Sequence, residues 1–308
     1  MSFIKGLLFS TSLAIANAKP ISPSKVVRAA ASPSTFPLGD ACENEWKYLN
    51  FDSGSDADKA HLQKLHDVIC NGELRAVAAW GVQAAEDSKK STNVAYDVFF
   101  SAEEDIPATI QDVLSRIAGQ STTEGKIGKI VGTMIVDNNG KCAAIPDTVD
   151  VLRDLDFKGR CDGKETEAYT DTDTDKREKI HFCDLGYDKP IGGGDIQCSS
   201  LDKYPSIKID TFSRVALHET LHYSTVGPAS KLDSQIVDQK NRDGDYAYGP
   251  ERAHGLNDPD QDGQPGKAES NADNYAWMAV TSWVSYLCTP EDEQDAWDSY
   301  FSEDPPEY

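Results

Sequence analysis

Two histidines and a glutamate stand close together in the second half of the chain, in the run His218-Glu219-Thr-Leu-His222. Residues four apart on a helix lie on one face, so both imidazoles can point at the same metal ion. The glutamate beside the first imidazole can then take a proton from metal-activated water. Zinc lowers the pKa of bound water to about 7. The spacing therefore predicts a hydrolytic zinc site; the alternative is a surface helix with two solvated histidines.

A catalytic zinc also needs a third protein ligand and an open fourth position. The pattern that supplies a third histidine fails here, because Thr225 and Pro228 stand where glycine and histidine are required. Two acids remain as candidates. Asp245 begins the segment Asp-Tyr-Ala-Tyr-Gly, and Glu269 begins the segment Glu-Ser-Asn-Ala-Asp. The residues alone leave this choice open.

The segment Asp-x-x-Tyr-Gly downstream of His-Glu-x-x-His resembles the aspzincin family of zinc metallopeptidases, which includes deuterolysin and the fungal peptidyl-Lys metalloendopeptidases. Residues 271–275, Asn-Ala-Asp-Asn-Tyr, are similar to a stretch that those enzymes carry on a later helix. The likeness covers residues 41–290 and is specific around these three motifs. It implies a secreted zinc-dependent endopeptidase.

The resemblance also implies roles for particular residues. His218, His222 and Asp245 would bind zinc, and Glu219 would be the general base. Tyr248 would donate a hydrogen bond or proton to the tetrahedral oxyanion, which suits a neutral phenol. The alternative for Tyr248 is a packed aromatic in a tyrosine-rich loop.

Three positions depart from the family pattern. Arg242 and Asp243 stand where the family has glycine and threonine. Lysine-specific members resemble Asn-Ala-Asp-x-x-Glu, and here Ala276 stands at the second acid position. Strict lysine specificity is therefore not expected. Asp273 remains as an expected substrate contact that favours a basic side chain; the alternative is a structural acid at the start of a helix.

A second metal motif lies between the zinc segments. Asp258, Asp260 and Asp262, followed by a glycine and by Glu269, fit the spacing of a calcium-binding loop. Pro265 stands where a β-branched residue normally pairs, so the alternative is a solvated acidic loop. Glu269 would not easily serve both calcium and zinc.

The N-terminus has the order of features of a secretory signal peptide. Lys5 precedes an apolar run at 6–15, and Ala-Asn-Ala at 16–18 matches a cleavage site. We therefore expect a signal peptide at 1–18, followed at 19–40 by a flexible leader or short propeptide rich in Pro, Ser and Ala.

Seven cysteines follow the expected cleavage site. In an oxidising compartment they predict three disulfides and one free thiol. Cys183 and Cys198 flank a glycine-rich stretch, and we expect these two to pair. A cysteine zinc site is disfavoured because no Cys-x-x-Cys spacing occurs.

The chain of 308 residues carries a formal net charge of −22. This excess of acid argues against nucleic acid or an anionic membrane as a partner. We expect a secreted monomer that acts on protein or peptide substrates. The competing hypothesis is a secreted zinc-binding protein without catalysis, such as a zinc scavenger or surface antigen. Glu219 separates the two, because such a protein does not need a general base.

The elements that position these residues predict an α+β fold with a zincin-like metallopeptidase domain at 41–290. Apolar residues at helical spacing give it a helical N-terminal half, with helices at 56–69, 73–86 and 105–118. Asp210 or Thr211 is expected to begin the helix that carries the two histidines.

A small sheet is expected between these helices and the histidine segment. Residues 127–136 are β-branched and precede an Asp-Asn-Asn-Gly turn, which predicts a strand that leads into a hairpin. A second strand is expected at 180–183. The polar residues 162–177 are expected to be an exposed loop, and residues 291–308 a solvated acidic tail.

Overall fold

A computed structural model describes residues 46–49, 51–52, 54–70, 72–90, 92–103, 105–119, 134–138, 160–161, 165–172 and 178–307. The expected signal peptide (1–18) and leader (19–40) lie outside these residues, as do Cys42 and Cys142. The described part is a mixed α and β structure, and helices make up most of its regular elements.

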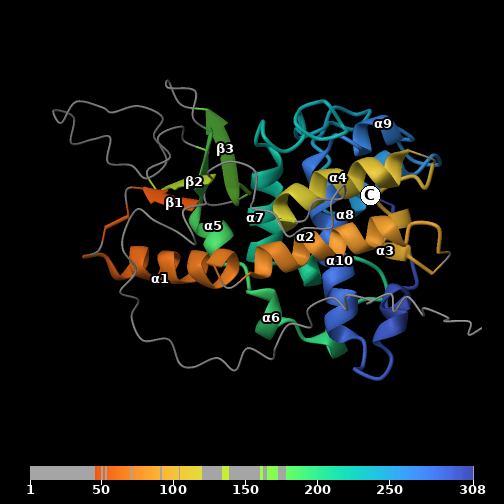
Figure 1. Cartoon of the computed structure of the whole chain (residues 1–308), viewed down its shortest axis with the longest axis horizontal. Coiled ribbons are helices and arrows are strands. Elements are labelled where there is room, and N and C mark those ends of the chain that lie inside the picture. Colours follow the sequence, from red (N-terminus) through yellow and green to blue (C-terminus); the bar gives the residue numbers. More distant parts are fainter. Residues whose placement is uncertain are drawn as a thin grey trace, which may run out of the picture. The chain divides into compact units, whose positions relative to one another are not determined.

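Four short strands form one sheet in the order β1-β2-β4-β3. β1 (Trp46–Leu49), β2 (Met134–Asp137) and β4 (Glu178–Phe182) run parallel to one another. β3 (Ala168–Thr172) runs antiparallel to β4 and, among the described strands, pairs with β4 alone. β3 is therefore the edge of the sheet, and it lies beside helix α7 (Figure 1).

In the view of Figure 1, helices lie below this sheet and to its right, and they form the rest of the regular elements. The α-helices are α1 (Asp56–Leu65), α2 (Glu73–Glu86), α3 (Val94–Asp97), α4 (Ile106–Ala118), α5 (Asp184–Tyr187), α6 (Gly192–Asp195), α7 (Phe212–Leu221), α8 (Pro250–Asn257), α9 (Pro265–Ala268) and α10 (Ala272–Cys288). A π-helical segment, η2 (His66–Cys70), continues α1, and three 3₁₀ segments are η4 (Cys198–Ser200), η5 (Ile207–Ile209) and η6 (Gln294–Ser299).

The core forms where α2 packs against α4 and α10, and where α10 also packs against α7. Gly81 makes the close approach of α2 feasible. A Cβ atom there would lie 2.7 Å from Leu114 Cδ1 and 2.9 Å from Ala279 Cβ. α10 is buried along nearly its whole length, with Tyr275 and Trp277 among the largest enclosed side chains. This central helix gives the fold a rigid support behind α7.

The described helices agree with the apolar spacing. α1 with η2, α2 and α4 occupy the three ranges predicted for the N-terminal half. In α4 the apolar positions Ile110, Leu114 and Ile117 are fully buried, and Gly119 ends the helix in a left-handed conformation with φ 74°. The α+β class and the helical N-terminal half are confirmed.

The sheet differs from the prediction in three ways, the first of which is that no strand was expected at β1. β2 covers only the end of the predicted strand, whose residues 127–133 lie outside the described part. It pairs in parallel with β1 and β4, so no hairpin joins it to a described neighbour. β3 lies inside residues 162–177, which were expected to form a loop. A polar edge strand such as Ala-Tyr-Thr-Asp-Thr buries little beyond Tyr169, so it lacks clear apolar alternation.

The C-terminal segment is not a solvated tail over its described length. Trp297 and Phe301 are 5% and 2% exposed, and the Trp297 ring packs against Trp80. The amide of Ser302 donates to the Lys203 carbonyl at 2.9 Å. The segment 291–307 therefore packs against the domain through two buried aromatic side chains, although many of its residues are acidic.

Two disulfides lie in the described part, Cys161–Cys183 and Cys198–Cys288. The expected pair of Cys183 with Cys198 is wrong. Cys183 follows β4 directly and joins the residues that lead into β3, whereas Cys198 joins the end of α10. The glycine-rich stretch between them forms α6 and does not bring the two cysteines together.

Candidate metal centre

Helix α7 begins at a defined cap and is buried throughout. The Thr211 hydroxyl accepts a hydrogen bond from the Arg214 amide at 3.2 Å, which satisfies one free donor of the first turn. Thr211 is thus the cap, one of the two residues expected for it. His218 and Glu219 lie in the last turn, and His222 follows the helix in a helical conformation. Both imidazoles therefore stand on one face.

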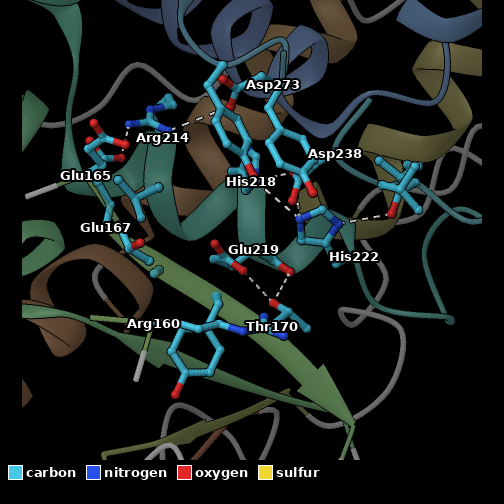
Figure 2. Close-up of a pocket in the computed structure, with 18 of the residues that line it drawn as sticks. Arg160, Glu165, Glu167, Thr170, Arg214, His218, Glu219, His222, Asp238 and Asp273 are labelled. Carbon is cyan, nitrogen blue, oxygen red and sulfur yellow. Dashed lines mark hydrogen bonds and ion pairs between the residues drawn. The ribbon is translucent and has the colours of Figure 1, made fainter. Parts of the chain in front are cut away.

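The two imidazoles converge on one point together with a carboxylate (Figure 2). Their Nε2 atoms lie 3.2 Å apart. Asp238 Oδ1 lies 3.1 Å from the Nε2 of His218 and 3.4 Å from that of His222. Side chains of His218, His222 and Asp238 thus form a group that could hold a metal ion.

The opposite nitrogen of each ring fixes its tautomer. His218 Nδ1 donates to Asp273 Oδ1 at 2.6 Å, and His222 Nδ1 donates to the Ile236 carbonyl at 3.0 Å. A neutral imidazole with its proton on Nδ1 presents a lone pair at Nε2. Two lone pairs and a carboxylate oxygen therefore face one another, an arrangement that needs positive charge between them.

The electrostatics of the cluster agree with this need. Burial opposes a charge on His218, but the carboxylates of Asp273 and Asp238 outweigh it and raise its pKa well above the usual range. Burial opposes a charge on Asp238 too, yet the adjacent imidazoles hold its pKa below the usual range. The site thus stabilises added positive charge, whether protons or a cation.

Asp245, the expected third ligand, lies outside this group. Its amide donates to the Asn241 side chain at 2.9 Å, and its carbonyl accepts from the Asn241 amide at the same distance. Its own side chain is 64% exposed and lies 3.9 Å from Arg252. The turn that these bonds close directs Asp245 to the surface, and Asp238, earlier in the same loop, takes its place.

The second candidate ligand, Glu269, is also away from the imidazoles. It does not line the cleft that contains them, and its carbonyl accepts a hydrogen bond from the Tyr275 hydroxyl at 2.7 Å.

The sequence motifs did not indicate Asp238 as a metal ligand. The local feature that could have indicated it is the β-branched pair Ile236-Val237 directly before it. This pattern is too common to identify a metal ligand.

Asp273, which was expected to contact substrate, is buried and hydrogen-bonded to His218. The residue is 2% exposed. Its Oδ1 accepts from His218, and its Oδ2 accepts from the Gly249 amide at 2.7 Å. Gly249 has φ 88°, a backbone conformation that favours glycine. The end of this loop therefore adopts a special backbone conformation where its amide contacts Asp273. Asp273 therefore orients His218.

Arg214 connects this carboxylate to the edge of the sheet. Its guanidinium pairs with Asp210 at 2.7 Å and with Glu167, which precedes β3, and lies 3.8 Å from Asp273 Oδ1 (Figure 2). Burial opposes its charge, but these three carboxylates raise the pKa of Arg214 above its usual range. The ion network fixes α7 relative to β3 and α10.

Glu219 faces the edge strand across the cleft. The Thr170 hydroxyl on β3 donates to Glu219 Oε2 at 2.7 Å and lies 2.9 Å from the Glu219 carbonyl (Figure 2). Glu219 is 4% exposed, and burial raises its pKa above the usual range. A carboxylate with a raised pKa is well suited to accept and then return a proton near neutral pH.

Tyr248 also reaches the centre. Its ring lies 6.1 Å from the His218 ring, between centroids, and stacks on Tyr246 at 5.2 Å. Partial burial and the nearby Asp238 carboxylate raise the pKa of the Tyr248 hydroxyl, so it stays protonated and can donate. The structure thus brings four of the six predicted site residues together around one point: His218, His222, Glu219 and Tyr248.

These side chains open onto a cleft of about 1180 Å³. The cleft is lined by residues of β3, by residues of α7, and by residues 235–238, 246, 248 and 249 of the loop that follows α7. A cleft of this size accommodates several residues of an extended chain. The arrangement therefore combines a metal-binding cluster, a buried carboxylate and a large accessible groove.

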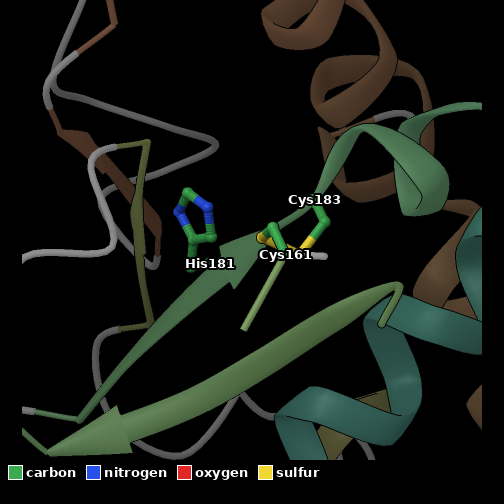
Figure 3. Close-up of side chains that lie close together, drawn as sticks. All are labelled: Cys161, His181 and Cys183. Carbon is green, nitrogen blue, oxygen red and sulfur yellow. A yellow bond between two sulfur atoms is a disulfide. The ribbon is translucent and has the colours of Figure 1, made fainter. Parts of the chain in front are cut away.

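Other groups with metal-binding residue types do not form a comparable centre in the described part. One such group consists of Cys161, His181 and Cys183, but its two sulfur atoms are bonded to each other in a disulfide (Figure 3). The expected calcium loop gathers no group of three carboxylates within metal-binding reach among the described residues. Instead, Asp258 accepts from the Asp260 amide at 2.9 Å, an ordinary turn contact.

The chain matches no protein-family model, and a comparison with curated proteins finds no match. None of the described helices is long and apolar enough to span a membrane. What can be said of function therefore comes from the residues of the centre itself.

Proposed function

We propose that this protein is a secreted zinc-dependent endopeptidase related to the aspzincins, with Asp238 as the third zinc ligand. The observation that carries the proposal is the convergence of His218 Nε2, His222 Nε2 and Asp238 Oδ1, with each imidazole oriented from behind by an oxygen. The aspzincin resemblance of the sequence supports the same class.

The donor set fits zinc. Two imidazole nitrogens and one carboxylate oxygen are a common catalytic set for this ion, and they leave a fourth position open. An ion bonded at about 2.0–2.1 Å to tetrahedral donors holds those donors roughly 3.3–3.4 Å apart. The three distances here are 3.2, 3.1 and 3.4 Å. The cluster is therefore close to the required size without rearrangement.

A bound zinc ion would act as a Lewis acid that polarises the scissile carbonyl and lowers the pKa of water. Glu219 accepts a proton from the attacking water and delivers it to the amine that leaves when the C–N bond breaks. Tyr248 donates a hydrogen bond to the oxygen that becomes negative in the tetrahedral state. Both groups line the cleft that contains the cluster.

The edge of the sheet supports a peptide as the substrate. β3 has a described neighbour on one side only, and it borders the cleft next to Glu219. A peptide in an extended conformation can lie along such an edge strand. This contact would align a peptide bond across the cluster in a fixed direction. A protein or peptide substrate therefore fits the cleft better than a small molecule.

Secretion is supported by two observations. The N-terminal sequence has signal-peptide features, and two disulfides join the described elements. Disulfides persist mainly in oxidising compartments.

The test compares casein cleavage by the wild type and by Glu219→Gln, with zinc content measured in both proteins. We expect about one zinc per chain in each, chelator-sensitive cleavage by the wild type, and a loss of at least about 100-fold in the variant, the scale of general-base catalysis. Glu219→Gln keeps the shape and the Thr170 contact, so folding is not expected to change.

Three other outcomes would count against the proposal. Stoichiometric zinc without cleavage in either protein would favour a zinc scavenger or surface antigen. Equal cleavage in both proteins that resists chelation would refute the zinc peptidase. If Asp238→Ala kept its zinc and activity while Glu269→Ala lost both, a glutamate-ligand zincin would replace the present assignment.

A further inference from the structure

The exposed apolar residues of the described chain are not scattered. The four large apolar or aromatic residues with the highest exposure are Ile207, Val237, Tyr246 and Tyr248, at 69%, 38%, 45% and 47%. All four line the cleft that contains the metal cluster. Single exposed apolar residues are common on protein surfaces, but their collection at one groove marks a binding surface.

Two of these residues are close to the reacting centre. Val237 directly precedes Asp238 in the chain. Tyr246 stacks on Tyr248 with an angle of 20° between the rings, and Tyr248 in turn lies 6.1 Å from the His218 ring. A substrate side chain that contacts Val237 and Tyr246 would therefore belong to a residue adjacent to the scissile peptide bond, which would lie at the cluster.

The backbone holds both residues in place before any substrate binds. The Val237 amide donates to the Ser270 carbonyl at 3.0 Å, and its carbonyl accepts from the Ala272 amide at 3.1 Å. The Ala247 amide, next to Tyr246, donates to the Gln239 carbonyl at 2.9 Å. A preorganised apolar surface loses little conformational entropy on binding, which favours affinity.

A lysine also lies against the Tyr246 ring. Lys240 Nζ lies 4.5 Å from the centre of the Tyr246 ring, and the two residues form an isolated β-bridge. The cation therefore already occupies one side of this ring. A second cation from a substrate would be repelled by Lys240.

Three of the acids that line the cleft, Glu167, Asp210 and Asp273, already have partners within the protein. Glu167 and Asp210 pair with Lys189 at 2.5 Å and also with Arg214. Asp273, the acid expected to receive a basic side chain, is buried against His218. These three carboxylates are thus engaged by cations within the protein.

We propose that the cleft selects peptides with a bulky aliphatic or aromatic side chain next to the scissile bond, bound against Val237, Tyr246 and Tyr248. The inference rests on the proposed peptidase function for the nature of the ligand. It names a substrate class that differs from the basic side chain that the sequence suggested.

The test uses zinc-loaded Glu219→Gln, which binds peptide without cleaving it. Fluorescein-labelled octapeptides of Ala, Gly and Ser carry one central Phe, Leu, Lys or Glu, and affinity is measured by fluorescence anisotropy. We expect the Phe and Leu peptides to bind about 10-fold or more tightly than the Lys and Glu peptides, the scale of an apolar pocket. Tyr246→Ala and Val237→Ala in the same background should each reduce that difference to about 3-fold or less.

Tyr204→Ala serves as the matched control, because Tyr204 is a partly exposed tyrosine outside the cleft. It should leave the preference intact. Equal affinity for all four peptides, tighter binding of the Lys peptide, or a preference that survives both cleft variants would overturn the inference. Cleavage of the same peptides by the wild type is scored separately. Selective binding of Phe and Leu without any cleavage would refute the peptidase but leave the apolar selectivity standing.

Discussion

Asp273 Oδ1 lies 2.6 Å from His218 Nδ1, so an acid at the start of α10 sets the orientation of an imidazole on α7. The same carboxylate accepts the Gly249 amide through its other oxygen. It thereby joins three parts of the cleft: the helix with the histidines, the loop that carries Tyr248, and the central helix. This one side chain therefore orients His218 within the candidate metal cluster.

Asp273→Asn should weaken zinc binding by about 10-fold to 100-fold, as expected for a residue that orients a metal ligand from behind. The amide still accepts from His218 but loses the negative charge, and its NH₂ group meets the Gly249 amide. Competition with a chromogenic chelator measures the affinity, and circular dichroism checks the fold. Unchanged zinc affinity with a raised KM would instead favour the substrate contact that the sequence suggested.

Thr170→Val should lower kcat about 10-fold or more while leaving zinc content unchanged, because the Thr170 hydroxyl holds Glu219 Oε2 toward the cleft. Thr172→Val is the control, since Thr172 is an exposed residue of the same strand. Steady-state kinetics on one peptide measures both variants. Equal effects of the two substitutions would indicate a general weakening of β3 rather than a role for this hydrogen bond.

Gly81→Ala should destabilise the protein by about 1–3 kcal/mol, the usual cost of an added methyl group in a packed core. The new Cβ would lie 3.3 Å from the Ala279 backbone, which cannot move aside as a side chain would. Gly266→Ala in α9 is the control: its Cβ meets nothing within 4 Å, so it should be neutral or slightly stabilising. Urea denaturation compares them, and similar free energies of unfolding for both variants would contradict the packing described.

Removal of the Cys198–Cys288 disulfide by two alanines should destabilise the fold by roughly 4–5 kcal/mol, against roughly 3 kcal/mol for Cys161–Cys183, because the first closes the longer loop. The sequence separations are 90 and 22 residues. Denaturation of the two double variants measures the difference. Mass spectrometry of unreduced peptides checks the pairing, and a Cys183–Cys198 peptide would contradict both assignments.

The local parts of the centre were predictable, and the distant parts were not. His218, Glu219 and His222 follow from the geometry of one helical turn. Asp238 could not be identified, because the loop that carries it has no periodic pattern that fixes where a side chain points. Asp245 lies in a recognisable sequence motif, whereas Asp238 does not. The hydrogen bond from the Asp245 amide to the Asn241 side chain closes a turn that leaves the Asp245 side chain at the surface.

The same contrast runs through the fold. α2 and α4 were predicted because their apolar residues repeat at helical spacing, whereas β3 was missed because an edge strand beside a polar cleft needs few apolar residues. Tyr246 and Val237 gave no sign of a binding surface in the sequence. Val237 is positioned by contacts with residues 270–272 and Tyr246 by its bridge to Lys240, and only the folded chain reveals these contacts.

The most direct measurement is the zinc affinity of Asp238→Ala and Asp245→Ala, determined side by side with the wild type by chelator competition. Loss of one of three ligands should weaken binding by at least about 100-fold in Asp238→Ala, beyond the 10-fold to 100-fold of a supporting contact. Asp245→Ala should stay within about 3-fold of the wild type, because its exposed side chain takes no part in the cluster. The reverse result, with zinc retained by Asp238→Ala and lost by Asp245→Ala, would contradict the metal centre described.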